Sequence, residues 1–408
     1  MYIQRFLEKD LLDYLSKPEI LAVVGPRQSG KTTLIKHIFE GLSESCFLDF
    51  EDRETLELFT EDVKSFVELH VRPYKYLFID EFQYAKNGGK NLKYIYDNYK
   101  TKIIVSGSSA SGISIQGIKF LVGRILVFNL YPFSFEEYLS YKEPDLYKNI
   151  YLKGGFSNII IEKIIPYFNE FCLYGGYPRV VLSKSSSEKE TILRNIYNTY
   201  FLREIKEILN IPDDYKLGRL IHVLALQVGN ILNYNELSSV TSLKYNDLLK
   251  NLNILEKTFI CKRGYPYYTN KRTELVKAPK MFFYDNGFRN IVIKNFQSIK
   301  NRGDKGLLYE NFVATELFKE QIELKYWRTK SKAEVDFIVE KSEKVIPIEV
   351  KSDLSRLAST KSFQSFAEKY KPEKSIVLSE KLFAERNNVF FRPIFYINSE
   401  LNTLSLKL

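Results

Sequence analysis

The chain has 408 residues, of which 45% are hydrophobic, and its formal net charge is +10. This length exceeds what one hydrophobic core usually spans, so we expect two to four domains. The sequence has no apolar run of membrane-spanning length and no signal-peptide pattern at its start, which favours a cytoplasmic protein without a membrane span. The three widely spaced cysteines, without histidines at metal-ligand spacing, indicate neither a disulfide framework nor a zinc site.

The first predicted elements are a buried parallel strand at 19–24, a glycine-rich loop and a helix that ends near Gly41. The loop fits the pattern G-x-x-x-x-G-K-[ST] and stands in the order of strand, loop and helix that this phosphate-binding motif requires. We expect the loop amides and Lys31 to hold the phosphates of ATP, and Thr32 to ligate Mg²⁺. The residues expected to bind the nucleotide are Gly25, Pro26, Arg27, Gln28, Ser29, Gly30, Lys31, Thr32 and Thr33.

The next strand, 76–79, ends in two adjacent carboxylates. This pattern is typical of an aspartate that holds Mg²⁺, here Asp80, followed by a glutamate that polarises the attacking water, here Glu81. An extended segment at 46–50 and a helix at 55–67 fill the interval between the two motifs, as an alternation of strand and helix requires. Together the motifs predict catalytic roles for Lys31 and Glu81.

Two further strands complete the predicted sheet. The strand at 102–105 leads into Ser106 and Ser108, which sense the terminal phosphate or orient water, or else belong to an ordinary turn. The edge strand at 125–128 follows Arg124. This arginine either reaches the nucleotide of a neighbouring subunit, which predicts a homo-oligomer with an arginine finger in trans, or lies on the surface at the start of the strand.

The middle of the chain has two parts. Residues 136–210 are rich in predicted helix, are broken at Gly175-Gly176-Tyr177-Pro178, and are interpreted as a lid or connector. Residues 211–295 are interpreted as a winged helix-turn-helix, because three helices precede a basic hairpin whose tip is Lys262-Arg263-Gly264-Tyr265-Pro266. The three helices are predicted at 216–228, 234–240 and 245–255, and the two hairpin strands at 258–261 and 267–269.

This winged-helix segment holds much of the positive charge. Between Thr241 and Lys280, nine Lys or Arg residues face three Asp or Glu residues, a surplus of +6. Such a surplus favours contact with the phosphate backbone of double-stranded DNA, with the third helix in the major groove. Winged helices also serve as protein-docking modules, so both interpretations stay open. The residues expected to contact phosphates are Lys244, Lys250, Lys262, Arg263, Lys271 and Arg272.

Residues 300–408 carry a second constellation of charged side chains. Glu310 projects from the apolar face of a helix at 306–321, and Glu349 and Lys351 share one face of a strand at 345–351. With Asp336 they form a D…E-x-K arrangement, in which Asp336 and Glu349 hold Mg²⁺ and Lys351 positions or deprotonates the water that cleaves a phosphodiester. The alternatives are a solvent face of alternating charge, or a fold kept for binding after catalysis was lost. The remaining predicted elements are a strand at 333–339, a helix at 356–370 and a strand at 375–378.

With these motifs in view, nearly the whole chain resembles a family of AAA-type ATP-binding proteins of archaea and bacteria. Members of this family join a P-loop domain to a winged helix and to a restriction-endonuclease-like C-terminal domain of unknown function. The resemblance implies a parallel ATPase sheet in the order 5-1-4-3-2 and hydrolysis of ATP, but no established substrate beyond ATP. Asn286 departs from the threonine-like residue that is more usual there. The resemblance rests on 25–32, 78–81, 106–109, 123–124 with 130–135, 175–178, 284–287, 334–336 and 349–351.

The predicted fold class is therefore α/β, with a P-loop core at 1–135, a helical lid at 136–210, a winged helix at 211–295 and a nuclease-like domain at 300–408. The first functional hypothesis is an ATP-dependent, DNA-associated enzyme whose nucleotide state controls the winged helix and the nuclease-like domain. The alternative is a signal-transducing ATPase switch with a catalytically dead C-terminal binding module. A DNA motor is a weaker third hypothesis, because paired translocation motifs are absent from the sequence.

Overall fold

The computed structural model describes residues 2–108, 120–154, 157–199, 214–341, 344–354, 356–357 and 360–403. These residues form two compact units, the first made of 2–133 with Lys257–Phe259 and the second of the other described residues from Ser134 onward. The parts expected as lid, winged helix and nuclease-like domain thus share one unit. Residues 200–210 of the expected lid, and Ser109, lie outside the described residues.

The first unit contains a five-stranded sheet in which every pairing is parallel. Its strand order is β2-β3-β4-β1-β5, which is 5-1-4-3-2 when it is read from the other edge. This is the order that the family resemblance implies. The strands are β1 (Ile20–Gly25), β2 (Ser45–Asp49), β3 (Tyr76–Asp80), β4 (Lys102–Ser108) and β5 (Ile125–Asn129).

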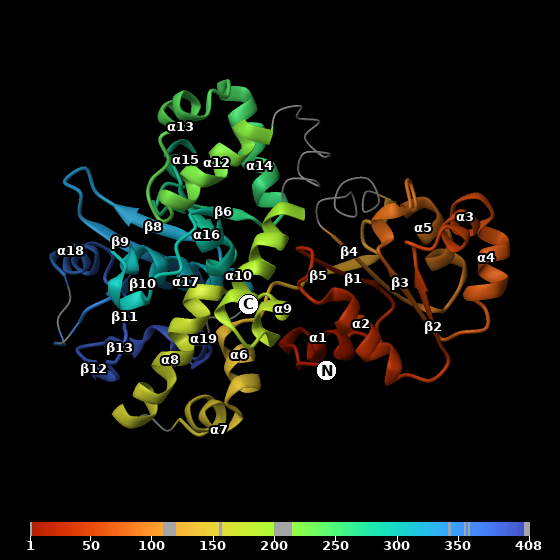
Figure 1. Cartoon of the computed structure of the whole chain (residues 1–408), viewed down its shortest axis with the longest axis horizontal. Helices are drawn as coiled ribbons and strands as arrows, with labels where there is room; N and C mark the ends of the chain where they lie inside the picture. Colours follow the sequence, from red (N-terminus) through yellow and green to blue (C-terminus); the bar gives the residue numbers. More distant parts are fainter. Residues whose placement is uncertain are drawn as a thin grey trace. The chain divides into compact units, whose positions relative to one another are not determined.

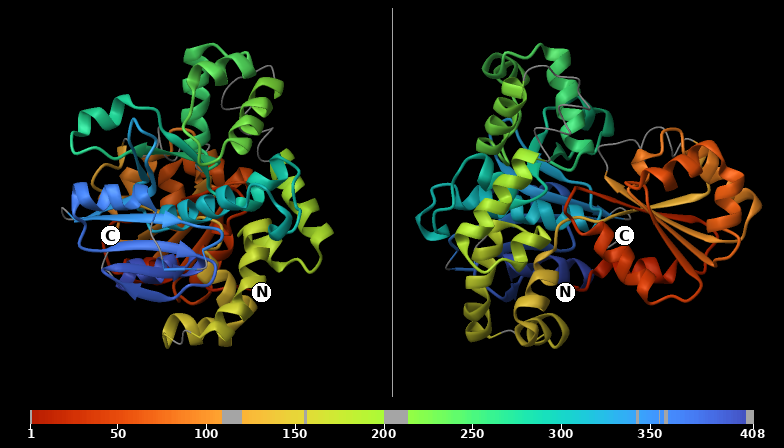
Figure 2. Two further views of the ribbon diagram at one scale, coloured as in Figure 1. Left: turned by 90° about the vertical axis from the view of Figure 1, so that its left-hand side faces the viewer. Right: turned by 45° about the vertical axis from the view of Figure 1, so that its right-hand side comes forward.

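Helices cover both faces of this sheet, as Figure 1 and Figure 2 show. Alternate residues of β1 face the two layers: Leu21 and Val23 pack with α1 and α2, whereas Ala22 packs with α3, α4 and α5. Burial on both faces explains the continuous apolar run of β1. The helix predicted at 55–67 is two helices, because the Asp62 side chain accepts a hydrogen bond from the backbone N–H of Ser65 and caps the second one. The helices are α1 (Phe6–Asp13), α2 (Lys31–Glu40), α3 (Arg53–Glu61), α4 (Val63–His70), the 3-10 turn η1 (Phe82–Tyr84) and α5 (Gly89–Asn98).

The second unit begins with helices. Ser134 and Glu137 form a reciprocal capping box that fixes the start of α6. After α8, the backbone N–H of Gly176 donates to the buried Asp285 carboxylate at 2.7 Å, so two of the motifs that carry the resemblance pack against each other. A side chain at Gly175 would clash with the Asp285 carboxylate, which accounts for the glycine. The helices are α6 (Phe135–Lys142), α7 (Pro144–Tyr147), the π-helical turn η4 (Lys148–Leu152), α8 (Asn158–Tyr174), α9 (Pro178–Leu182) and α10 (Ser186–Asn195).

The hairpin predicted at 258–269 is wrong. Its supposed tip is the strand β6 (Cys261–Pro266), which pairs antiparallel with β7 (Lys280–Phe283) and parallel with β8 (Lys325–Arg328). Gly264 suggested a turn, but in the structure it is a strand glycine: a Cβ there would lie 3.2 Å from Leu324 and 3.3 Å from Phe282. The preceding helices are α12 (Asp214–Leu226), α13 (Tyr234–Thr241) and α14 (Tyr245–Lys257).

The strand β6 joins this segment to the C-terminal strands in one eight-stranded sheet, ordered β12-β13-β11-β10-β9-β8-β6-β7. Within it, β9 (Glu334–Lys341) is antiparallel to β8 and β10 (Lys344–Val350), and β10 is parallel to β11 (Ser375–Ser379). The helix predicted at 356–370 begins only at Lys361, because Thr360 caps it. The other elements are α15 (Lys271–Val276), α16 (Asn286–Val292), η6 (Ile299–Asn301), α17 (Lys305–Lys319), α18 (Lys361–Tyr370), β12 (Ala384–Arg386), β13 (Val389–Pro393), η7 (Ile394–Tyr396) and α19 (Ile397–Thr403).

Within the described part of the chain, none of the helices combines the length and the apolar character needed to cross a lipid bilayer.

Candidate nucleotide-binding site

The candidate site lies at the carboxyl edge of the five-stranded sheet. Gly25 pairs with Ser108, and Ile79 at the end of β3 pairs with Val105 on β4. Because the strands are parallel, the loop after β1, the carboxylates after β3 and the serines of β4 meet at one edge. Ser106 and Ser108 lie within β4, which runs to Ser108, so they are strand residues and not part of a turn.

The loop backbone explains two of its glycines. Gly25 passes so close to the end of β5 that a Cβ would lie 2.1 Å from the carbonyl oxygen of Leu130. Gly30 has a φ of 94°, a left-handed conformation that glycine adopts without strain, and it leads directly into α2. The buried Lys31 ammonium donates to the carbonyl oxygens of Gly25 and Pro26 at 3.1 and 2.9 Å. The Lys31 side chain therefore folds back over the loop, and the loop leads directly into the N-terminus of α2.

Arg5, which belongs to none of the predicted motifs, anchors this loop through hydrogen bonds. Its guanidinium donates to the carbonyl oxygen of Ser29 at 2.9 Å and to that of Tyr131 at 2.7 Å, and it lies over the Phe133 ring. The arginine is 6% exposed. It thus ties the P-loop to the segment that follows β5. In the sequence it is a lone arginine outside any motif.

The carboxylates after β3 form a small hydrogen-bonded network. The Ser106 hydroxyl and the backbone N–H of Glu81 both donate to Oδ1 of Asp80, which is 1% exposed. The amide of Gln83 donates to the Glu81 carboxylate, and its oxygen accepts from the backbone N–H of Ser108 at 3.2 Å. Gln83 therefore links the two strand ends, another role that spacing alone does not predict.

Glu81 has two properties of a functional carboxylate. Its φ of 51° lies in the left-handed region, which is uncommon for a residue with a side chain and recurs at functional sites. Burial raises the pKa of the Glu81 carboxyl, and Asp80 adds to this, whereas the Gln83 hydrogen bond, Lys31 and Arg27 oppose it. A carboxylate with a raised pKa accepts a proton more readily than an ordinary glutamate does. Glu81 is thus suited to take a proton from water.

The residues at this edge fit a magnesium ion. Both hydrogen bonds to Asp80 fall on Oδ1, so Oδ2 accepts neither of them. A carboxylate and the Thr32 hydroxyl are the hard oxygen ligands that Mg²⁺ prefers, and phosphates and water supply the rest of its shell in sites of this kind. When bound, the ion would neutralise charge on the phosphates; Asp80 and Thr32 would hold it.

Arg124 lies just before β5, at the amino ends of the strands, whereas the P-loop lies at their carboxyl ends. Its carbonyl oxygen accepts from the backbone N–H of Ile20 at 2.8 Å, at the start of β1, and the six residues of β1 span about 20 Å. Its guanidinium is paired with Asp97 at 2.7 Å and is about one-third exposed. Arg124 therefore cannot serve the P-loop of its own chain, and a finger role requires a neighbouring subunit.

The parallel sheet, the P-loop and the Asp80-Glu81 pair define the first unit as an AAA-type P-loop ATPase domain. A family model described as an AAA domain matches residues 17–139, which include the whole loop and both carboxylates. Two models described as domains of unknown function match residues 165–298 and 305–395.

Two relatives that match most of the chain are described only as uncharacterised. An uncharacterised protein of Haemophilus influenzae is 26% identical over 371 residues, which cover 86% of this chain and 85% of that protein. An uncharacterised protein of Methanocaldococcus jannaschii is 24% identical and covers 82% of this chain and 75% of its own length. These similarities extend beyond the ATPase unit.

Among solved structures, a Walker-type ATPase of Pyrococcus abyssi is 15% identical with a TM-score of 0.42, covering 71% of this chain and 96% of that one. A signal transduction ATPase with numerous domains from Pyrococcus horikoshii is 14% identical with a TM-score of 0.29, covering 78% and 45%. Likenesses at these scores define neither a fold nor a function for the second unit.

The C-terminal constellation is brought together by α17, β9 and β10. The Lys351 ammonium lies 3.0 Å from Oε1 of Glu349, which also accepts from the Thr360 hydroxyl at 2.7 Å. Asp336 accepts from the backbone N–H of Val350 at 2.8 Å. Burial raises the pKa of the Glu310 carboxyl, with the nearby Asp336 charge adding to the rise. The four predicted residues are therefore neighbours.

The six predicted phosphate-binding residues divide into two groups. Arg263 is paired with Glu256, Lys271 is paired with Glu340 at 2.8 Å, and the Lys262 ammonium lies over the Phe318 ring. These three serve contacts within the chain. The other three, Lys244, Lys250 and Arg272, are exposed, as is Lys271 despite its ion pair.

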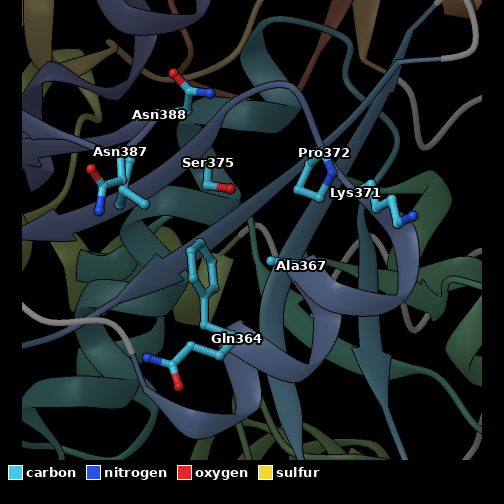
Figure 3. Close-up of a pocket in the computed structure, with 9 residues that line it drawn as sticks. Gln364, Ala367, Lys371, Pro372, Ser375, Asn387 and Asn388 are labelled. Atoms are coloured by element: carbon cyan, nitrogen blue, oxygen red, sulfur yellow. The ribbon is translucent and has the colours of Figure 1, made fainter.

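A hollow of about 300 Å³ lies between α18 and the strands β11 and β13 (Figure 3). It is lined by Gln364, Lys371, Ser375 and Asn387 among others, and none of the predicted site residues contributes to it. Since no carboxylate lines the hollow, it adds nothing to either candidate site.

Proposed function

We propose that this chain hydrolyses ATP at the carboxyl edge of the first unit and that its nucleotide state controls the second unit. The observation that carries the proposal is the meeting of Lys31, Asp80 and Glu81 at one edge of a parallel sheet. Lys31 would hold the terminal phosphates, Asp80 the magnesium ion, and Glu81 would take the proton of the attacking water. Ser106 would orient Asp80, because its hydroxyl donates to that carboxylate.

We further propose that Arg124 acts in trans, since it lies at the sheet edge away from its own P-loop. ATP turnover per chain is then expected to rise with protein concentration as subunits associate. Arg124→Ala is expected to lower turnover at high concentration by about 1,000-fold or more, the usual contribution of an arginine finger. Steady-state hydrolysis of ATP with Mg²⁺ over a concentration series, compared with the exposed-arginine control Arg53→Ala, measures this. Undiminished hydrolysis in Arg124→Ala would exclude the finger.

A DNA-associated role is supported by the pair α13 and α14. A three-residue turn, Ser242–Lys244, joins the two helices, and Ser242 is in the left-handed conformation. The exposed side of α14 and its preceding turn carries Lys244, Asn246 and Lys250. The helix α14 is formally neutral, because its two lysines are balanced by Asp247 and Glu256, so the positive charge offered to a major groove comes from Lys244 in the turn and Lys250 on the exposed side.

Double-stranded DNA is therefore expected to bind the chain, with an affinity that falls steeply as salt increases. Lys250→Ala is expected to weaken binding to all sequences alike and to reduce the salt slope by about 1, whereas Lys374→Ala, an exposed lysine elsewhere in the unit, leaves both unchanged. Fluorescence anisotropy of labelled duplexes at several salt concentrations makes this comparison. If no duplex binds at low salt, the DNA role is wrong and the regulatory-switch hypothesis takes its place.

A further inference from the structure

A buried lysine from outside the D…E-x-K motif lies among the carboxylates of the C-terminal constellation. Lys280, on β7, has a side chain that is 3% exposed, and its ammonium lies 2.5 Å from Oε1 of Glu334. Glu310 and Asp336 are the other two carboxylates whose charges act on it most strongly. The lysine therefore supplies positive charge on the α17 and β9 side of the cluster.

The segment around Gly229 and Ile231 packs against the same side of the cluster. Gly229, with a φ of 76°, precedes a bridge between Ile231 and Lys280, and its backbone N–H donates to the carbonyl oxygen of Met281 at 2.8 Å. A Cβ at Gly229 would lie 3.2 Å from Oε2 of Glu310. The cluster is thus built from two segments, and the part after residue 305 does not form it alone.

In each of the two predicted metal ligands, one carboxylate oxygen is already engaged by groups of the chain itself. Lys351 and Thr360 share Oε1 of the buried Glu349, and Oδ2 of Asp336 takes a backbone N–H. Mg²⁺ requires near-octahedral oxygen ligands at 2.0–2.1 Å. In the part of the chain that the structure describes, no three His, Cys, Asp or Glu side chains converge to hold a metal ion. Asp336 and Glu349 therefore do not fit the metal site expected from the sequence.

The position of the Lys280 ammonium points the same way. Four carboxylates, those of Glu310, Glu334, Asp336 and Glu349, are accompanied by the ammonium groups of Lys280 and Lys351. A divalent ion placed among them would repel the Lys280 ammonium, which is too deeply buried to be stabilised by water. Oε2 of the buried Glu349 has no hydrogen-bond partner, but among the described residues no group of three His, Cys, Asp or Glu side chains surrounds it to hold a metal ion.

We infer that Lys280 is the resident cation of this cluster, in place of a divalent metal, and that it holds β7 to β9 and α17. The C-terminal part of the chain is then a structural and binding module, and Asp336 and Glu349 bind no catalytic metal. This inference is independent of the proposed ATPase activity, because it concerns side chains of the second unit only.

The test is Mn²⁺ binding to the full-length chain without nucleotide. Binding is measured from the electron paramagnetic resonance signal of the free ion. The isotherms of the wild type and of Asp336→Asn are expected to superpose. Lys280→Gln is expected to lower the melting temperature by about 5 °C or more, since it leaves buried carboxylates without their counter-charge. Lys262→Gln, which removes a partly buried lysine from the neighbouring strand β6, serves as the matched control and is expected to show a smaller shift.

Mn²⁺ binding that Asp336→Asn or Glu349→Gln abolishes would overturn the inference, and so would an unchanged melting temperature in Lys280→Gln. If Lys280→Gln does not fold, the comparison of the wild type with Asp336→Asn decides the question alone. Failure of ATP hydrolysis would leave this result unaffected, because the assay contains no nucleotide.

Discussion

Replacing Lys31 by alanine is expected to lower ATP turnover by about 100-fold or more and to weaken ATP binding. The Lys31 ammonium is buried beside the loop carbonyl oxygens of Gly25 and Pro26, at the N-terminus of α2. In such a site a fixed cation faces the charge that develops on the transferred phosphoryl group, and losing one such donor costs about 100- to 1,000-fold in rate. Phosphate release under steady-state conditions measures the effect.

The matched control is Lys36→Ala, because Lys36 is an exposed lysine on the same helix, one and a half turns further along. It removes the same charge from α2 without touching the loop. Equal turnover in Lys36→Ala and the wild type, with a large loss only in Lys31→Ala, is the expected pattern. Similar losses in both variants would mean that helix stability, and not phosphate contact, is being measured.

Glu81→Gln is expected to lower turnover by about 100- to 10,000-fold, the usual contribution of a positioned general base, while ATP binding stays near the wild-type value. Glutamine keeps an oxygen that can accept from Gln83, so the local network survives, but it cannot take a proton. Filter binding of labelled ATP, set beside the turnover rate, separates the two effects.

The pH profile gives a second measure of this prediction. Because burial raises the pKa of Glu81, wild-type turnover should fall on acidification at a higher pH than an ordinary glutamate would give. Glu51→Gln, which changes an exposed carboxylate after β2, should keep both the rate and the profile. An unaltered rate in Glu81→Gln would assign the base role elsewhere.

The ATP site could be predicted from the sequence because each of its parts is local. Gly25–Thr32 and Asp80-Glu81 each follow an apolar strand, and parallel strands bring their carboxyl ends to one edge. Spacing alone therefore placed Lys31 near Asp80. The supporting residues Arg5 and Gln83 could not be predicted, because their partners lie far along the chain or depend on the turn after β3.

The second unit was less predictable because a glycine can mark either a turn or a closely packed position within a strand. Gly264 in a basic segment suggested the tip of a hairpin, whereas close packing against Leu324 and Phe282 places it within β6. The same pairing brings β7 into the sheet and so brings Lys280 to the carboxylates. Nothing in the D…E-x-K pattern specifies a lysine that precedes it by dozens of residues.

Equilibrium binding of ATP in the presence of Mg²⁺, measured by isothermal titration calorimetry on the wild type and on Lys31→Ala, tests the central claim most directly. The site described at Gly25–Thr32 predicts one ATP per chain, with an affinity that depends on Mg²⁺ and that Lys31→Ala greatly reduces. The absence of ATP binding to the folded wild type, or binding that Lys31→Ala leaves unchanged, would contradict the assignment of this site.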